Sequence, residues 1–190
     1  MEKKYIEDQI FDKIDFTKGE FGEGEYDTCK FINCNLSGVD LSSFHFFECE
    51  FSGCNLGGAK LVKTAFKTVH FKDCKMTGLH FDLCTSFLFA VGFDDCILDL
   101  SSFYKVKLKN TRFNNCRLHE VDFVGADLTL AVFDNCDLAK AGFENTILEK
   151  ADFRTAYNYA MDPAINNLRK AQFSLPAVTG LLSKYEIEIS

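Results

Sequence analysis

Nine cysteines and four histidines are the residues of this chain whose types could do chemistry. The cysteines recur in a similar context, as in FINCNLSG at residues 31–38 and CEFSGCNLGG at residues 49–58. Cysteine and histidine ligate zinc, cysteine pairs form disulfides, and activated thiolates act as redox groups. Three kinds of site are therefore conceivable: a metal centre, a redox device and a disulfide scaffold.

A large apolar residue recurs every five positions along most of the chain. The series runs from Phe11 to Phe81, steps by seven to Leu88, and continues to Phe153. Two residues before each lies a second position, mostly glycine, alanine, valine or cysteine. A period of five fits neither an amphipathic helix nor a flat strand, whose side chains repeat every 3.6 and 2 residues. It indicates a coil with one short turn per five residues.

This pattern resembles the pentapeptide-repeat family, whose motif is roughly a small residue, Asp or Asn, Leu or Phe, and two polar residues. The chain reads CNLSG, ADLTL, CDLAK and ADFRT, with looser variants such as CEFSG and VDFVG. The resemblance covers residues 9–156. It implies an all-β fold, a right-handed quadrilateral parallel β-helix, with about seven coils over residues 11–156.

The square coil can be tested on the sequence, because residues 20 apart should stack on one wall, about 4.8 Å apart. One wall has phenylalanine at every rung from Phe11 to Phe153, if one step of 22 is allowed. The two extra residues lie in FDLCTSF, between Phe81 and Leu88. They predict a surface bulge within residues 82–87 that leaves the core in register.

In this coil every cysteine except Cys84 occupies the small inward position. One column consists of Cys34, Cys54, Cys74, Cys96, Cys116 and Cys136. Parallel side chains on successive rungs lack the convergent directions that a zinc site or a disulfide needs. We expect these thiols to be reduced and buried as small apolar groups, with Cys84 in the bulge.

The histidines form no catalytic constellation. His45, His70 and His80 each precede a core position and His119 follows one, so all four should point outward on different walls or rungs. Metalloprotease, Walker, nucleophile-elbow and dinucleotide-binding motifs are absent from the sequence. We therefore expect a non-enzymatic protein with no catalytic residue, no metal and no cofactor.

Both ends of a solenoid need a cap, because open strand edges promote aggregation. Residues 1–10 should form an N-terminal cap and residues 157–190 a helical cap. Asp162 with Pro163 predicts a helix over residues 163–171, and Ser174 with Pro176 a second one through about Lys184. The apolar residues that could cover the last coil or pair two chains are Leu175, Val178, Leu181, Leu182 and Tyr185.

One part of the outer surface is a candidate partner site. Aromatic and lysine side chains fall at outward positions of the fourth wall beside the bulge: Phe47, Lys67, Phe87, Phe89, Lys107 and Lys109. Clustered exposed aromatics can mark a partner site, whereas isolated ones are common. Partial burial beside the bulge is the alternative.

Two functions remain open. The first is a scaffold that presents its outer surface to another protein. The second follows from the resemblance, because Qnr-like proteins mimic duplex DNA and act on DNA gyrase or topoisomerase IV. The net charge of −7 fits such mimicry, whereas the slightly basic middle third and the lack of long loops fit it less well.

The resemblance to the Qnr and mycobacterial gyrase-inhibitor types also implies a homodimer through the C-terminal segment. No apolar window of about 18 residues and no signal-peptide pattern occur, so we expect a cytoplasmic protein without a membrane partner. Direct binding to nucleic acid is not expected.

Overall fold

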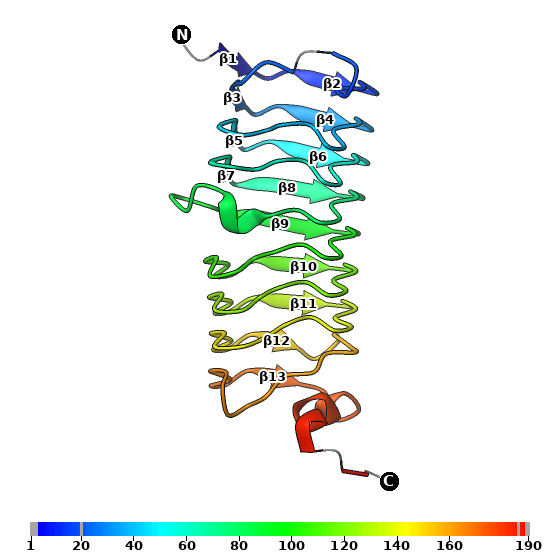
Figure 1. Cartoon of the computed structure of the whole chain (residues 1–190), viewed down its shortest axis with the longest axis vertical. Coiled ribbons are helices and arrows are strands. Elements are labelled where there is room, and N and C mark those ends of the chain that lie inside the picture. Colours follow the sequence, from blue (N-terminus) through cyan, green and yellow to red (C-terminus); the bar gives the residue numbers. More distant parts are fainter. Residues whose placement is uncertain (1–3, 20, 186, 189–190) are drawn as a thin grey trace.

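The structure, a computed structural model, describes residues 4–19, 21–185 and 187–188. It is a rod of about eight stacked turns, with the first described residues at one end and the last at the other (Figure 1). The strand pairs are parallel. This arrangement confirms the all-β parallel β-helix, with about eight turns rather than about seven.

One wall of the rod is a nine-stranded parallel sheet. Phenylalanine pairs with phenylalanine along it, as in Phe31↔Phe51, and the pair Phe71↔Phe93 shows that the step of 22 preserves the register. The strands are β2 (Ile10–Asp12), β4 (Lys30–Ile32), β6 (Glu50–Ser52), β8 (Val69–Lys72), β9 (Val91–Asp94), β10 (Arg112–Asn114), β11 (Val132–Asp134), β12 (Asp152–Phe153) and β13 (Gln172–Phe173).

The other walls are built from shorter pairings. Single bridges such as Asn35↔Asn55 and Ser102↔Asp122 continue the ladder on two of them. Corner residues with left-handed backbone geometry, such as Asn33 at φ 52°, end each extended segment after a few residues. The fourth wall begins as a four-stranded sheet of β1 (Lys4–Glu7), β3 (Gly24–Asp27), β5 (His45–Phe47) and β7 (Ala65–Lys67).

Stacked phenylalanine rings fill the interior. Along the phenylalanine wall the ring centroids of Phe113 and Phe133 are 4.9 Å apart with an interplanar angle of 1°. Phe123, on the opposite wall, meets Phe113 edge-on at 6.0 Å and 82°. Parallel stacking along the rod and edge-to-face contacts across it are both favourable aromatic geometries. A phenylalanine at the repeated position therefore packs well both along the rod and across it.

The cysteine column is buried as expected, and all nine cysteines are free thiols. Each column thiol also donates a hydrogen bond to a backbone carbonyl of the preceding coil, for example Cys54 Sγ to Phe31 O at 3.2 Å. Thr64 Oγ1 makes the equivalent bond to Leu41 O at 2.8 Å. A small side chain at the inward position can thus donate to this carbonyl when it carries a donor. Burial raises the pKa of Cys49 to about 12, which keeps its thiol protonated at neutral pH.

The C-terminal helix expected over residues 163–171 does not form, because the coil continues through these residues. Asn166 is buried at the small inward position and donates from Nδ2 to Phe143 O at 2.8 Å, as the column thiols do. Phe173 then stacks on Phe153 at 5.4 Å. The stretches NNLRK and AQFSL are two further repeats, and they complete the extra turn.

The second expected helix, through Lys184, is replaced by two short 3-10 helices, η2 (Val178–Leu181) and η3 (Ser183–Tyr185). Gly180 lies against Tyr159 of the last coils so closely that a Cβ at this position would collide with the Tyr159 carbonyl oxygen. The Gly180 carbonyl in turn accepts a hydrogen bond from Met161 N at 3.1 Å. The C-terminal segment is therefore a cap of irregular turns.

Candidate protein-interaction surface

Residues 82–90, here called the loop, leave the side of the rod between β8 and β9 (Figure 1). The 3-10 helix η1 (Phe81–Leu83) leads into the loop. Thr85 N donates to Thr64 O at 2.8 Å and Ala90 N to Phe66 O at 3.1 Å, so the backbone is bonded to the preceding coil on both sides. The two extra residues are accommodated between these bonds.

The loop reverses two expected side-chain directions. Phe89 turns inward and meets Phe66 and Phe81 edge-on, at 6.4 and 6.3 Å between ring centroids. Leu88 is 63% exposed, with φ 56°. The predictions of an outward Phe89 and an inward Leu88 were therefore wrong. The physical reason is that the chain rejoins the core one residue later than the five-residue count predicts.

Exposed apolar side chains gather on and beside the loop. Phe87 is 68% exposed, and Leu83 and Leu88 are exposed with it. Val62 and Tyr104, at the same wall position one coil before and one coil after Asp82, are exposed as well. We call this set of five, Val62, Leu83, Phe87, Leu88 and Tyr104, the loop patch. The sequence interpretation included only Phe87 of these.

Lys67 joins the fourth wall to the loop. Its Nζ lies 4.4 Å from the ring centroid of Phe47 and 5.3 Å from that of Phe87. Cation–π contacts of this length hold the ammonium group between two rings and stabilise the position of Phe87. Three of the six residues predicted as a partner surface are thus brought together.

A hollow of about 480 Å³ lies between the loop and the following coil. Phe89 and Val106 supply apolar lining, and Lys105, Lys107 and Asp82 supply charge. Lys107 lines the hollow, whereas Lys109, which was predicted to belong to the same surface, forms an ion pair with Asp127 at 3.2 Å. The hollow can therefore receive an apolar side chain, with ammonium groups beside it.

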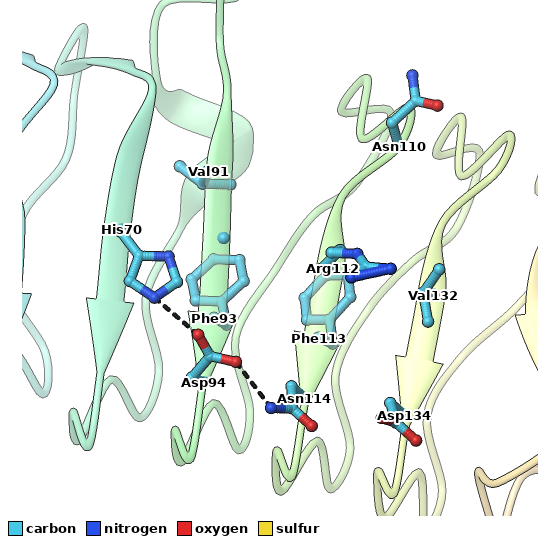
Figure 2. A pocket seen from close by; sticks show the side chains of 11 residues that line it. His70, Val91, Phe93, Asp94, Asn110, Arg112, Phe113, Asn114, Val132 and Asp134 are labelled. Carbon is cyan, nitrogen blue, oxygen red and sulfur yellow. Dashed lines mark hydrogen bonds and ion pairs between the residues drawn. The ribbon is translucent and has the colours of Figure 1, made fainter.

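A second hollow, of about 410 Å³, lies on the outer side of the phenylalanine wall (Figure 2). Gly92 leaves an open rung between His70 and Arg112. His70 Nε2 pairs with Asp94 Oδ2 at 2.7 Å, and Asn114 Nδ2 donates to Asp94 Oδ1 at 2.9 Å. A histidine held by a carboxylate can exchange protons, but serine, threonine, cysteine and lysine are absent from the described lining. The described lining of the hollow thus offers polar contacts without a hydroxyl, thiol or amine nucleophile.

The other histidines also lie on the surface beside carboxylates. His119 Nε2 is 2.8 Å from Asp137 Oδ2, and His80 Nδ1 is 3.2 Å from Asp82 Oδ1. Burial raises the pKa of Asp137, but hydrogen bonds from His119 and Asn158 outweigh it and lower that pKa overall. No group of three potential metal-ligating side chains occurs among the described residues.

The five predicted C-terminal residues divide between two environments. Leu181 packs against the core and Val178 is half-buried. Leu175 is 87% exposed, and Leu182 and Tyr185 are exposed too. Part of the segment therefore covers the last coil, and part of it faces outward.

No helix in the described part of the chain is long and apolar enough to cross a bilayer.

Solved structures of similar shape share little sequence with the chain. A trypsin-treated variant of QnrB1, a plasmid-mediated fluoroquinolone resistance protein, has 19% identity and a TM-score of 0.49, covering 99% of this chain and 98% of that one. HetL of the cyanobacterium Nostoc sp. strain PCC 7120, involved in regulating heterocyst differentiation, has 16% identity and a TM-score of 0.34, with coverages of 90% and 84%. These likenesses concern the fold alone.

Sequence comparison places the chain more firmly. No curated protein matches it. The family model described as a pentapeptide repeat region matches residues 24–87 and 86–157, which is more than half of the chain. The chain therefore belongs to the pentapeptide-repeat family.

Proposed function

We propose that this pentapeptide-repeat chain is a non-enzymatic scaffold that binds another protein through the loop patch. The observation that supports the proposal is the gathering of exposed apolar side chains where the repeat is interrupted. Leaving Phe87 and Leu88 in water gains no burial energy, and contiguous exposed apolar groups of this kind are typical of binding surfaces.

The loop is held in a defined position, which favours binding. Thr85 and Ala90 bond to the preceding coil, Phe89 packs on the core, and Lys67 contacts the Phe87 ring. A surface ordered before binding loses less conformational entropy when a partner docks. The rod thus presents the loop patch as a preorganised surface.

Site-specific photo-crosslinking tests this proposal. Benzoylphenylalanine replaces Phe87 in one variant and Tyr157, an exposed aromatic on a different wall, in a matched control. We expect one dominant protein adduct from position 87 in an extract of the source cells, and none from position 157. No adduct, or the same adducts from both positions, would contradict the proposal.

A DNA mimic that acts on DNA gyrase or topoisomerase IV is the second candidate. The net charge of −7 and the acidic first coils favour it. A supercoiling assay with purified gyrase, run with and without a fluoroquinolone, should show inhibition or protection. No effect at micromolar protein would reject this function.

A homodimer through the C-terminal segment is a separate proposal. The exposed Leu175 and Tyr185 support it, because two copies could cover each other's apolar side chains. Light scattering should give twice the chain mass of 21.5 kDa. A mass of one chain at every concentration would reject the dimer.

A further inference from the structure

We infer that the partner docks an acidic segment with apolar side chains on the loop patch and in the hollow beside it. This inference rests on the proposed function and adds the chemistry of the partner. It follows from the charges around the loop.

Four lysines surround the loop patch. Lys63 N donates to Leu83 O at 2.8 Å, Lys67 contacts the Phe87 ring, and Lys105 and Lys107 line the hollow. In the part of the chain that the structure describes, none of their ammonium groups has a carboxylate within 4 Å. Some lysines elsewhere on the rod do have one: Lys30 with Glu50, Lys60 with Asp40, Lys109 with Asp127 and Lys140 with Glu120. Others, such as Lys72, Lys150 and Lys170, have none among the described residues, so what distinguishes the loop is that four unpaired lysines lie around one apolar patch.

These four lysines form a local cluster of positive charge on a chain whose net charge is −7. The carboxylate in the hollow, Asp82, lies 3.2 Å from His80 and so faces another group. Carboxylates of a partner would therefore find ammonium groups that no carboxylate of the described residues pairs with, because the rings beside Lys67 and Lys105 do not neutralise their charge. Electrostatic complementarity of this kind selects partners and speeds their encounter.

The apolar groups make the second half of the match. Phe89 and Val106 can contact an apolar side chain placed in the hollow, while Phe87 and Leu88 lie beside it. A purely acidic segment would leave Phe87 and Leu88 in water and the hollow beside Phe89 and Val106 without an apolar occupant. The arrangement therefore fits a segment that combines acidic residues with leucine or phenylalanine.

Two other partners fit less well. The basic DNA-binding surface of a topoisomerase would place like charges against these lysines, which opposes binding. An anionic membrane would match the lysines and the exposed Phe87 and Leu88. Its flat surface, however, would leave the hollow lined by Lys105 and Lys107 unoccupied. A protein segment is the occupant that uses every part of the site.

Fluorescence anisotropy with synthetic peptides tests the inference on the full chain. The labelled peptide is rich in Asp, Glu, Leu and Phe; one control peptide replaces the acidic residues by Lys and another replaces the apolar residues by Ser. We expect saturable binding of the first peptide alone, weakened by salt because charges are screened. Amide chemical-shift changes should fall at residues 63–67, 82–90 and 104–107.

Charge reversal supplies the matched variants. Lys105→Glu with Lys107→Glu should weaken peptide binding at least tenfold. The control, Lys150→Glu with Lys170→Glu, reverses two exposed lysines away from the loop and should change binding less than twofold. Equal weakening by both pairs, no binding of the acidic peptide, or equal binding of the Lys peptide would overturn the inference.

Further outcomes separate this inference from the proposed function. Vesicles of phosphatidylserine and phosphatidylcholine that bind through Phe87 and Leu88, with no peptide binding, would overturn it in favour of a membrane. An adduct from position 87 that survives the Lys105→Glu and Lys107→Glu changes would overturn the acidic partner and leave the scaffold proposal standing. Absence of any adduct would remove the scaffold proposal itself.

Discussion

The coil that carries β10 and the loop place the same side chain in opposite environments. Phe113 is fully buried between Phe93 and Phe133, whereas Phe87 is largely exposed. Residue type is identical, so sequence spacing decides burial: Phe113 lies 20 residues after Phe93, and Phe87 falls in the stretch that contains the two extra residues. The repeat supplies the core, and its interruption supplies an apolar surface.

The strongest way to sharpen this comparison is to truncate both rings. Phe113→Ala removes a fully buried ring stacked on both sides and should lower the free energy of unfolding by about 3–5 kcal/mol. Phe87→Ala should change it by less than about 0.5 kcal/mol, because the ring is on the surface. Urea unfolding followed by circular dichroism measures both. Similar losses in the two variants would mean that the loop supports the fold.

Two threonines allow the same contrast for a hydroxyl group. Thr64 is fully buried and donates to Leu41 O, which also accepts from Phe44 N, so Thr64→Val removes one of two hydrogen bonds to that carbonyl. A cost of about 0.5–1.5 kcal/mol is expected. Thr85, in the loop, donates to Lys63 O at 3.1 Å near solvent, so Thr85→Val should cost less than about 0.5 kcal/mol. An equal cost in urea unfolding would contradict the difference in burial.

Acid should destabilise the coils. A hydrogen bond from Arg154 lowers the pKa of Asp152, and the pKa of Asp137 is lowered as well. Carboxylates with a lowered folded-state pKa stabilise the protein above their unfolded pKa, about 3.9, and this contribution is lost as the pH falls through the folded value. The urea concentration at the unfolding midpoint should therefore decrease when the pH is lowered below about 4. A midpoint that stays level from pH 4 to 2 would contradict these pairs.

The thiols should give the smallest effect. Cys84 is half-buried in the loop, whereas the column cysteines are fully buried. Burial, followed by the Asp82 carboxylate, raises the pKa of Cys84, so even this thiol should react slowly. Maleimide labelling of native protein, read by mass spectrometry, should modify Cys84 first. Rapid labelling of most of the nine would show that the column is open.

Sequence spacing predicted the walls, the phenylalanine register and the cysteine column because each repeat contributes the same geometry. It did not predict the direction of Phe89. That direction depends on where the loop backbone returns to the coil, which is set by the hydrogen bond from Ala90 N to Phe66 O. The turn through Asn166 and Phe173 could have been found, since these residues keep the five-residue spacing. Asp162 with Pro163 instead predicts a helix, and the continued five-residue spacing overrides that local signal.

The candidate surface was predicted in part. Phe47, Lys67 and Phe87 come together as expected, because they occupy neighbouring rungs of one wall. The exposure of Leu83 and Leu88 depends on the path of the loop, which the five-residue count does not describe. The five-residue count therefore predicts where the repeat is interrupted, but the directions of the side chains in the loop are known only from the structure.

Deleting Ser86 and Phe87 tests the central claim most directly. The deletion places Leu88 20 residues after Phe66 with Cys84 two positions before it, which makes a regular repeat. We predict a free energy of unfolding within about 1 kcal/mol of the wild type. We also predict that affinity capture with the deletion variant no longer retains the partner that is identified by crosslinking at position 87 of the undeleted chain. Retained capture of that partner, or unfolding of the deletion variant, would contradict the claim that the regular repeats stabilise the fold while the loop binds the partner.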